Sequence, residues 1–235
     1  MDFDWGFAWD VFLSVWAGVP VSVGLVVAAL VLGLPLGYLL AVLRFKRAPV
    51  GRQVSALYVS FIRGTPMIVQ IYIAYNLLPS LLNMFFKQYN IEVNIFDVPN
   101  IIYGIIVFAL NTAAISSEAF RGSLASIDKG QMEAAVSIGM TSWQAYRRII
   151  IPQTLVSALP NLCSITVNLF KGTTLVFIMS IQDITAIAKT AAGRTYKYLE
   201  AYLVIFIVYL IFCFAIEKLF KAGENKLRVF KGTPA

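Results

Sequence analysis

Long apolar stretches separated by short polar segments run through the whole chain. A helix needs about 20 apolar residues to cross the ~30 Å hydrocarbon core of a lipid bilayer. Five stretches reach or approach that length, namely residues 19–43, 67–86, 98–117, 149–170 and 201–216. We therefore predict an all-α integral membrane protein with five transmembrane helices.

Two other segments are apolar in part but do not fit a membrane span. Residues 3–16 mix aromatic with acidic side chains, so we expect this segment to lie along the membrane interface. Residues 173–181 are apolar but too few to cross the bilayer. We expect them to form a helix that packs within the protein near its outer face.

The basic residues fall mainly on one side of the five spans. Segments 44–63 and 121–148, together with the tail after Glu217, hold fourteen Lys and Arg residues, whereas the segments on the other side hold five. Cytoplasmic loops of membrane proteins carry an excess of Lys and Arg. We therefore predict that the N-terminus lies outside the cell and the C-terminus lies in the cytoplasm.

The composition excludes several classes of protein. Hydrophobic residues make up 59% of the 235 residues and charged residues 13%, which is about half the charged share of an average soluble domain. The net charge of +7 does not indicate a nucleic-acid partner, because the basic residues lie in short loops between apolar spans. The chain has no histidine, and we expect no metal site. Cys163 and Cys213 lie in apolar stretches and are interpreted as small hydrophobic residues.

We predict one transmembrane domain over residues 1–235, because no repeat, low-complexity run or flexible linker interrupts the chain. Within this domain we expect an interfacial segment over about residues 1–17, a membrane region over 18–217 and a cytoplasmic tail over 218–235.

The polar segment 131–143, between the third and fourth spans, carries signals for two short helices. Gly139 is expected to end the first helix in a left-handed conformation, and Glu133 is expected near the N-terminus of that helix, where a carboxylate is favoured. Thr141 and Gln144 have the spacing of a capping box, which predicts the start of a second helix. On these grounds alone, the segment is equally well interpreted as an amphipathic connector that rests on the bilayer.

The order Glu133-Ala134-Ala135, three residues, Gly139, nine residues and then Ile-Ile-Ile-Pro resembles the EAA loop of binding-protein-dependent ABC importer permeases, whose pattern ends Ile-x-Leu-Pro. The resemblance implies that Glu133, Ala134, Ala135 and Gly139 belong to a short cytoplasmic coupling helix, which docks in a groove on an ATPase subunit. The small side chains of Ala134 and Ala135 would then permit close approach to that groove.

Other stretches resemble the polar amino-acid subfamily of these permeases. Residues 63–70 (RGTPMIVQ) resemble its RGTPLLVQ stretch, and residues 118–122 (EAFRG) resemble its E-x-x-R-G motif. Lys171 begins a turn similar to its K-x-T/S-S-L motif, although Gly172 stands where an acidic or amide residue is common. The resemblance covers about residues 18–217 and implies a multi-pass permease for polar amino acids in the bacterial cytoplasmic membrane.

Several of these motif residues have a physical role that the sequence suggests. Gly64 and Pro66 are expected to break a helix at the start of the second span, and Arg63 either bonds the freed carbonyl groups or extends to the membrane surface. Glu118 and Arg121 are three residues apart on one helical face, so we expect an ion pair. The full set that we assign to gating or structure is Arg63, Gly64, Thr65, Pro66, Glu118, Arg121, Pro152 and Lys171.

Polar side chains inside membrane spans are costly, so each of them needs a reason. They either line a substrate path or form hydrogen bonds between neighbouring helices. The candidates for the substrate path are Gln70, Asn76, Asn111, Asn161, Ser164, Asn168, Thr173 and Thr174. Family members that import basic amino acids often carry a carboxylate in the corresponding part of the fourth span. Residues 163–168 contain none, so we expect a neutral or zwitterionic substrate such as cystine or glutamine.

The chain has no G-x-x-x-x-G-K-[ST] phosphate-binding loop, so we expect no enzymatic activity and no cofactor on this chain. ATP and Mg²⁺ would be bound by two partner ATPase subunits in the cytoplasm. Five helices are too few to enclose a path, which implies a dimer with a second permease copy or a paralogue, and an extracytoplasmic amino-acid-binding protein would deliver the substrate. The alternative, an ion-coupled carrier or channel, would show Asp, Glu or His within the spans, and only Glu118 comes near that position.

Overall fold

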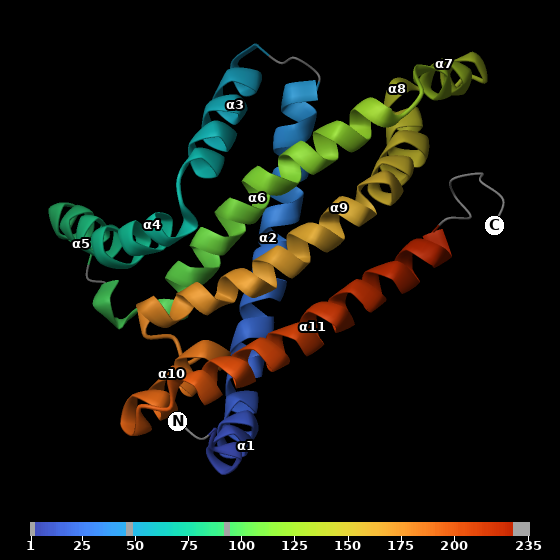
Figure 1. The fold of residues 1–235 in the computed structure, drawn as a ribbon. Helices are drawn as coiled ribbons and strands as arrows, with labels where there is room; N and C mark the ends of the chain where they lie inside the picture. The colour runs from blue at the N-terminus through green and yellow to red at the C-terminus, as the bar shows by residue number, and fades with distance from the viewer. Residues whose placement is uncertain (1–2, 46–48, 92–94, 228–235) are drawn as a thin grey trace.

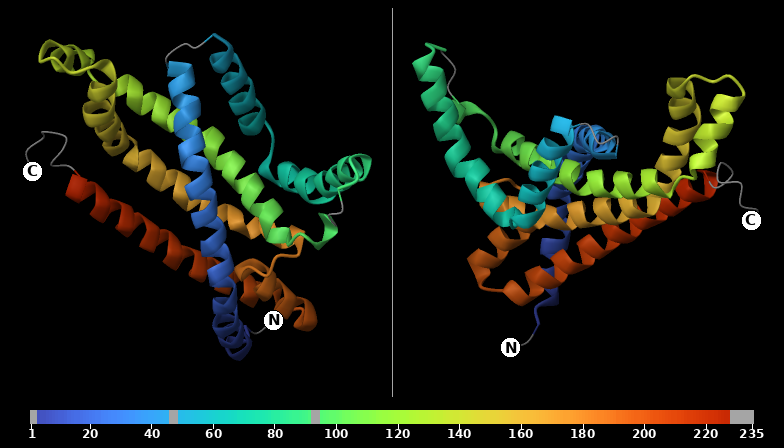
Figure 2. Two further views of the ribbon diagram at one scale, coloured as in Figure 1. Left: turned by 180° about the vertical axis from the view of Figure 1, so that it is seen from behind. Right: turned by 90° about the horizontal axis from the view of Figure 1, so that it is seen from above.

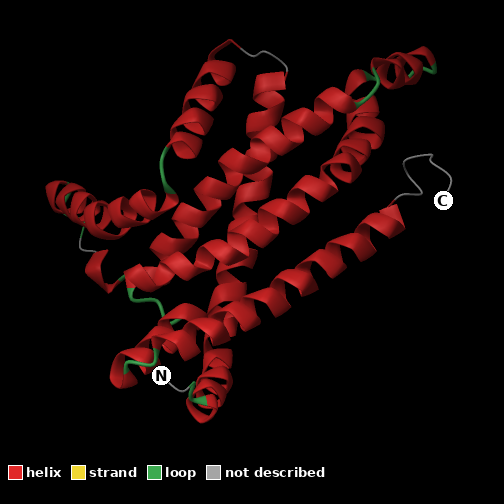
Figure 3. Ribbon diagram, viewed as in Figure 1, coloured by secondary structure: helices red, strands yellow, loops and turns green. Residues whose placement is uncertain are grey.

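The computed structural model describes residues 3–45, 49–91 and 95–227. Within these ranges all regular structure is helical, and no strand is present (Figure 3). Five helical stretches of the described residues are long and apolar enough to cross a membrane: Trp5–Phe45, Met67–Gln88, Asn100–Ser126, Ser142–Met179 and Tyr198–Lys226. The prediction of five membrane-spanning helices is therefore confirmed.

The first stretch combines α1 (Trp5–Ser14), the 3₁₀ turn η1 (Val15–Gly18) and α2 (Val19–Phe45). Asp4 caps α1 by accepting a hydrogen bond from the N–H of Phe7 and forms an ion pair with Lys197, which precedes the last helix. The hydrogen bond and charge of Lys197 lower the pKa of Asp4. The expected interfacial segment is thus a helix that leads directly into the first span, and its ion pair connects it to a distant part of the chain. Residues 1 and 2 lie outside the described residues.

Helix α2 crosses α6 (Asn100–Ser126) in the most extensive contact between two helices of the described residues. Two glycines of α2 make the close approach possible. A Cβ atom on Gly33 would lie 2.7 Å from the carbonyl oxygen of Ala109, and one on Gly37 would lie 2.8 Å from that of Ala113. Small residues spaced by four positions allow the backbones of membrane helices to meet in this way.

The segment that we interpreted as a basic loop over residues 44–63 contains a 16-residue helix, α3 (Pro49–Gly64). Its buried residues Ser55, Val59 and Ile62 lie on the side that packs against α2 and α6. Apolar residues at the helical spacing of four, three and four form an exposed second face, which consists of Val50, Val54, Leu57 and Phe61. The helix was missed because its apolar residues are interspersed with polar ones and form no continuous apolar stretch.

The second span begins after a break at residues 65 and 66 and consists of α4 (Met67–Tyr72), the π-helical turn η2 (Ile73–Leu77) and α5 (Leu78–Gln88). A second π-helical turn, η4 (Tyr146–Ile150), joins α8 (Ser142–Ala145) to α9 (Ile151–Gly172). Each π turn ends two residues before a proline, Pro79 or Pro152. Proline cannot donate to the carbonyl four residues earlier, and the wider turn accommodates the missing donor.

The last part of the chain folds back on itself at one end of the molecule. Helix α9 continues as the 3₁₀ helix η5 (Thr173–Met179), followed by α10 (Ile184–Thr195) and α11 (Tyr198–Leu227). Thr173, Val176 and Met179 of η5 are buried, so this segment packs within the protein as predicted. Asp183 is fully buried and caps α10 through the N–H of Ala186, and its burial raises its pKa.

The first part of the expected cytoplasmic tail is helical, because α11 extends to Leu227. Residues 228–235 of that tail lie outside the described residues.

Helices α6, α9 and α11 run side by side and cross α2 obliquely (Figures 1 and 2). The connection between α6 and α9 contains α7 (Lys129–Ser137) and α8, and it lies at the opposite end of the molecule from α1 and α10 (Figure 1). The 3₁₀ turn η3 (Ile95–Asp97) leads into α6.

Candidate functional site

Helix α7 and helix α8 form the projecting connection that the EAA pattern singled out. Asp128 caps α7, and its carboxylate accepts a hydrogen bond of 2.6 Å from the N–H of Gly130. The expected place of Glu133 near the helix N-terminus is wrong, because Glu133 is the fifth residue of α7 and lies beyond the first turn. Asp128 is the carboxylate at the helix N-terminus instead.

The end of α7 and the start of α8 have the predicted geometry. Gly139 has a φ of +86°, its N–H donates to the carbonyl of Val136 at 2.9 Å, and the N–H of Met140 donates to the carbonyl of Ala135 at 3.1 Å. This is the hydrogen-bond pattern of a helix that ends in a left-handed residue. Thr141 and Gln144 form both hydrogen bonds of the capping box that starts α8. The prediction of two helices joined at Gly139 is confirmed.

The two alanines of the EAA pattern face in different directions. Ala135 is only 2% exposed and packs inside the chain, whereas Ala134 is exposed. The expectation that both alanines present a small-residue surface is therefore corrected. The exposed surface of the connection is formed by Ala134 together with large apolar residues, above all Ile138 at 79% and Trp143 at 66% exposure.

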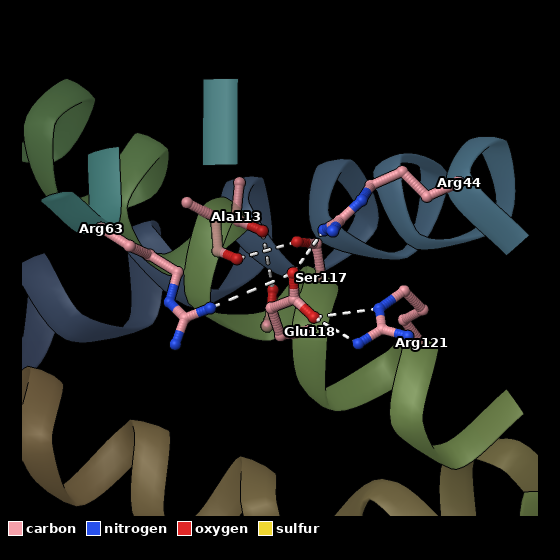
Figure 4. Close-up of polar contacts among 8 residues, drawn as sticks. Arg44, Arg63, Ala113, Ser117, Glu118 and Arg121 are labelled. Carbon is pink, nitrogen blue, oxygen red and sulfur yellow. Dashed lines mark hydrogen bonds and ion pairs between the residues drawn. The ribbon is translucent and has the colours of Figure 1, made fainter. Parts of the chain in front are cut away.

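A charged cluster lies where α2, α3 and α6 meet (Figure 4). Glu118 of α6 accepts hydrogen bonds from Arg44 at 2.5 Å and from Arg121 at 2.9 Å, and Arg63 lies 4.0 Å from the same carboxylate. The predicted ion pair between Glu118 and Arg121 is confirmed. The part played by Arg44 was missed, although an arginine that directly follows a long apolar span is a signal that could have indicated it.

The break between α3 and α4 lies where Gly64 and Pro66 predicted it. Of the two roles that the sequence left open for Arg63, bonding of the freed carbonyl groups is not seen among the described residues, and the Arg63 guanidinium instead lies 4.0 Å from the carboxylate of Glu118. The hydrogen bonds at the break come from Gln70 and from the hydroxyl of Thr65.

Four of the predicted substrate-path residues border one cavity of about 540 Å³ between α3, α6 and α9: Asn111, Asn161, Ser164 and Asn168. Arg63 and Glu118 of the charged cluster border the same cavity. So does Thr112, whose hydroxyl is buried and has no hydrogen-bond partner among the residues that the structure describes. An apolar pocket with a few convergent polar groups is the usual form of a small-molecule site.

The remaining candidates lie elsewhere. Asn76 bonds the carbonyl of Tyr72 in its own helix, and Thr173 is fully buried with its hydroxyl 3.0 Å from that of Tyr209. Thr174 and Lys171 border a groove between α9 and α11, on the other side of α9. The structure thus gathers half of the predicted set around one cavity.

Comparison with known proteins agrees with this architecture. Residues 33–229 match the family model described as binding-protein-dependent transport system inner membrane component. The chain belongs to this family. It is 34% identical over 226 residues to the probable amino-acid permease protein YxeN of Bacillus subtilis, with 95% of this chain and 96% of the relative covered.

Two further comparisons cover nearly the whole chain. It is 32% identical to the L-cystine transport system permease protein TcyL of Bacillus subtilis, over 96% of this chain and 92% of the relative. The crystal structure of an amino acid ABC transporter with histidines superimposes with a TM-score of 0.79 at 27% identity, over 96% of this chain and all of that chain.

Membership of the family identifies the chain as the transmembrane subunit of an ABC importer, a multi-pass protein of the bacterial inner membrane. Such subunits work with an ATPase and a binding protein, and ATP is hydrolysed by the partner ATPase. This permease is accordingly not itself an enzyme.

Proposed function

We propose that this permease moves a polar amino acid, neutral or zwitterionic, through the cavity between α3, α6 and α9. The names of the relatives support an amino-acid substrate, since one belongs to a cystine system and the superimposed structure is an amino acid transporter. The cavity supports the finer assignment through its polar groups.

The lining of the cavity suits a ligand that carries a carboxylate. The guanidinium of Arg63 is about half exposed, and at 4.0 Å from Glu118 it makes only a loose ion pair. A guanidinium binds a carboxylate through two parallel hydrogen bonds. The amides of Asn111, Asn161 and Asn168 can donate to and accept from the remaining polar groups of an amino acid.

A cationic side chain would find less support there. Glu118 is the acidic residue among those that border the cavity, and its carboxylate is already bonded to Arg44 and Arg121. Three arginines beside one carboxylate leave an excess of positive charge. This excess favours neutral or zwitterionic amino acids over arginine and lysine.

The assembly that we propose contains a second permease copy or paralogue, two ATPase subunits and an extracytoplasmic binding protein. The exposed apolar residues of α7 and α8 support a docking site for the ATPase, because apolar side chains gathered at a projecting end of a molecule favour a protein partner. The side of the membrane on which this end lies stays a prediction, carried by the distribution of Lys and Arg.

The experiment is uptake of labelled cystine or glutamine into vesicles that contain the permease with its ATPase and receptor. Arg63→Gln should raise the KM by about tenfold, the effect of losing a hydrogen bond to a charged group. Arg52→Gln, which removes an exposed arginine of the same helix that does not border the cavity, is the matched control and should leave the KM unchanged. Preferred uptake of arginine, or an unchanged KM in Arg63→Gln, would contradict the proposal.

A further inference from the structure

Pro66 leaves two carbonyl groups without a helical partner at the break between α3 and α4. In a continuous helix the carbonyl of Ile62 would accept from the N–H of residue 66, but proline has no N–H. The carbonyl of Thr65 would accept from the N–H of Val69, but that N–H donates to the carbonyl of Pro66 at 3.0 Å. Within a membrane protein such groups need another donor.

The side-chain amide of Gln70 supplies that donor. Its Nε2 lies 2.8 Å from the carbonyl oxygen of Ile62, 3.1 Å from that of Thr65 and 2.7 Å from the hydroxyl of Thr65. The Thr65 hydroxyl in turn lies 3.0 Å from the carbonyl oxygen of Phe61. One side chain from the first turns of α4 therefore closes the last turn of α3.

The same amide is linked to the cavity. Asn111, which borders the cavity, donates from Nδ2 to Oε1 of Gln70 at 3.4 Å. This bond is long and therefore weak. A substrate that accepts a hydrogen bond from Asn111 would compete for it.

The two helices joined by Gln70 have different neighbours. Helix α3 packs against α2 and α6, whereas α4 packs against α6 and η5, and the two point in different directions (Figure 1). We propose that Gln70 is a positioning residue that fixes the angle between α3 and α4, and that Asn111 connects this hinge to the cavity. Only the second part rests on the proposed function.

The first part is tested by a distance across the hinge. Spin labels at Leu57 of α3 and Met84 of α5, both exposed, measure the distance between α3 and the far part of the second span in complexes diluted with unlabelled permease. Gln70→Glu keeps the size of the side chain but removes both N–H donors, and it places a carboxylate against three oxygen atoms. Gln70→Met removes the donors without adding charge.

Both variants should broaden the distance distribution between the labels and lower the maximal transport rate by about tenfold, because they remove the partly buried hydrogen bonds of Nε2. Gln88→Glu adds the same charge to an exposed glutamine at the end of α5 and should change neither quantity. A distribution that stays narrow in both Gln70 variants would overturn the positioning role, whatever happens to transport.

The second part is tested with Asn111→Leu, which is of similar size, removes the donor to Gln70 without adding a charge and leaves the three contacts of Nε2 in place. This variant should keep the narrow distance distribution without substrate and raise the KM for transport. An unchanged KM would overturn the link between the cavity and the hinge. Because the distance measurement needs no substrate, failure of the hinge proposal and failure of the proposed function give different results.

Discussion

Glu118 accepts hydrogen bonds from two arginines that differ in their surroundings. Arg44 comes from the end of α2 and its side chain is 19% exposed, whereas Arg121 lies on the same helix as Glu118 and is 45% exposed. Exposed ion pairs contribute little to stability, while pairs shielded from water are costly to break because one charge is left without a partner. The pair between Arg44 and Glu118 should therefore contribute more than the pair with Arg121.

We predict that Arg44→Gln lowers the melting temperature of the purified permease by several degrees, consistent with a loss of about 1–3 kcal/mol. Arg121→Gln should lower it by less than half as much. The measurement is thermal unfolding in detergent, with both variants at equal protein concentration. Equal effects would mean that burial of Arg44 does not strengthen its pair.

Some of the contacts made by single residues could be predicted from the sequence, and others could not. The ion pair of Glu118 with Arg121 follows from their spacing, as does the left-handed Gly139 from its place after a short helix. The role of Gln70 could not be predicted in this way, because its acceptors become available only through the geometry of the break. The inward direction of Ala135 likewise depends on how α7 packs against α8 and η4.

At the scale of elements, the contact between α2 and α6 holds the first and third spans together. A Cβ atom on Gly37 would lie 2.1 Å from the hydroxyl oxygen of Ser116 and 2.8 Å from the carbonyl oxygen of Ala113. The hydroxyl can rotate away, but the carbonyl belongs to the backbone of α6. Any side chain at position 37 must therefore push the helices apart.

Gly37→Ala should consequently destabilise the protein by about 1–3 kcal/mol, the usual cost of overpacking. Gly24→Ala, in the same helix, is the matched control, since a Cβ atom there meets nothing within 4 Å. It should be neutral or slightly stabilising, because alanine favours a helix more than glycine does. Thermal unfolding of both variants compares the two positions directly, and equal stability would show that the close approach is not required.

The five spans were predictable because each needs about 20 mostly apolar residues, and so long an apolar stretch is easily recognised in a sequence. Their ends were less so: α6 extends to Ser126 and α11 to Leu227, beyond the apolar windows, since helices continue into polar sequence where packing and capping allow. Helix α3 was missed for a related reason. Its apolar residues form no continuous stretch, because they follow the helical spacing and alternate with polar residues.

At the scale of the whole molecule, the two candidate sites lie apart along the chain and in space. The cavity is bordered by the middle parts of α6 and α9, and α7 and α8 project from the end where these two helices are joined (Figure 1). If the projecting end moved, α6 and α9 would transmit the displacement directly to the residues that border the cavity. This arrangement suits a protein in which ATP hydrolysis on a partner drives a change at the substrate path.

We propose that the α7–α8 end both docks the ATPase and transmits the effect of ATP hydrolysis, and co-purification of the ATPase with permease variants tests this role. Ile138→Asp places a charge on an apolar side chain that is 79% exposed beside Gly139. Leu199→Asp makes the same change to a side chain that is 70% exposed at the start of α11, near the opposite end of the molecule. We expect that Ile138→Asp loses the ATPase and substrate-stimulated hydrolysis, while Leu199→Asp keeps the ATPase bound. Full association of the ATPase with Ile138→Asp, in a permease that is folded and inserted, would contradict it.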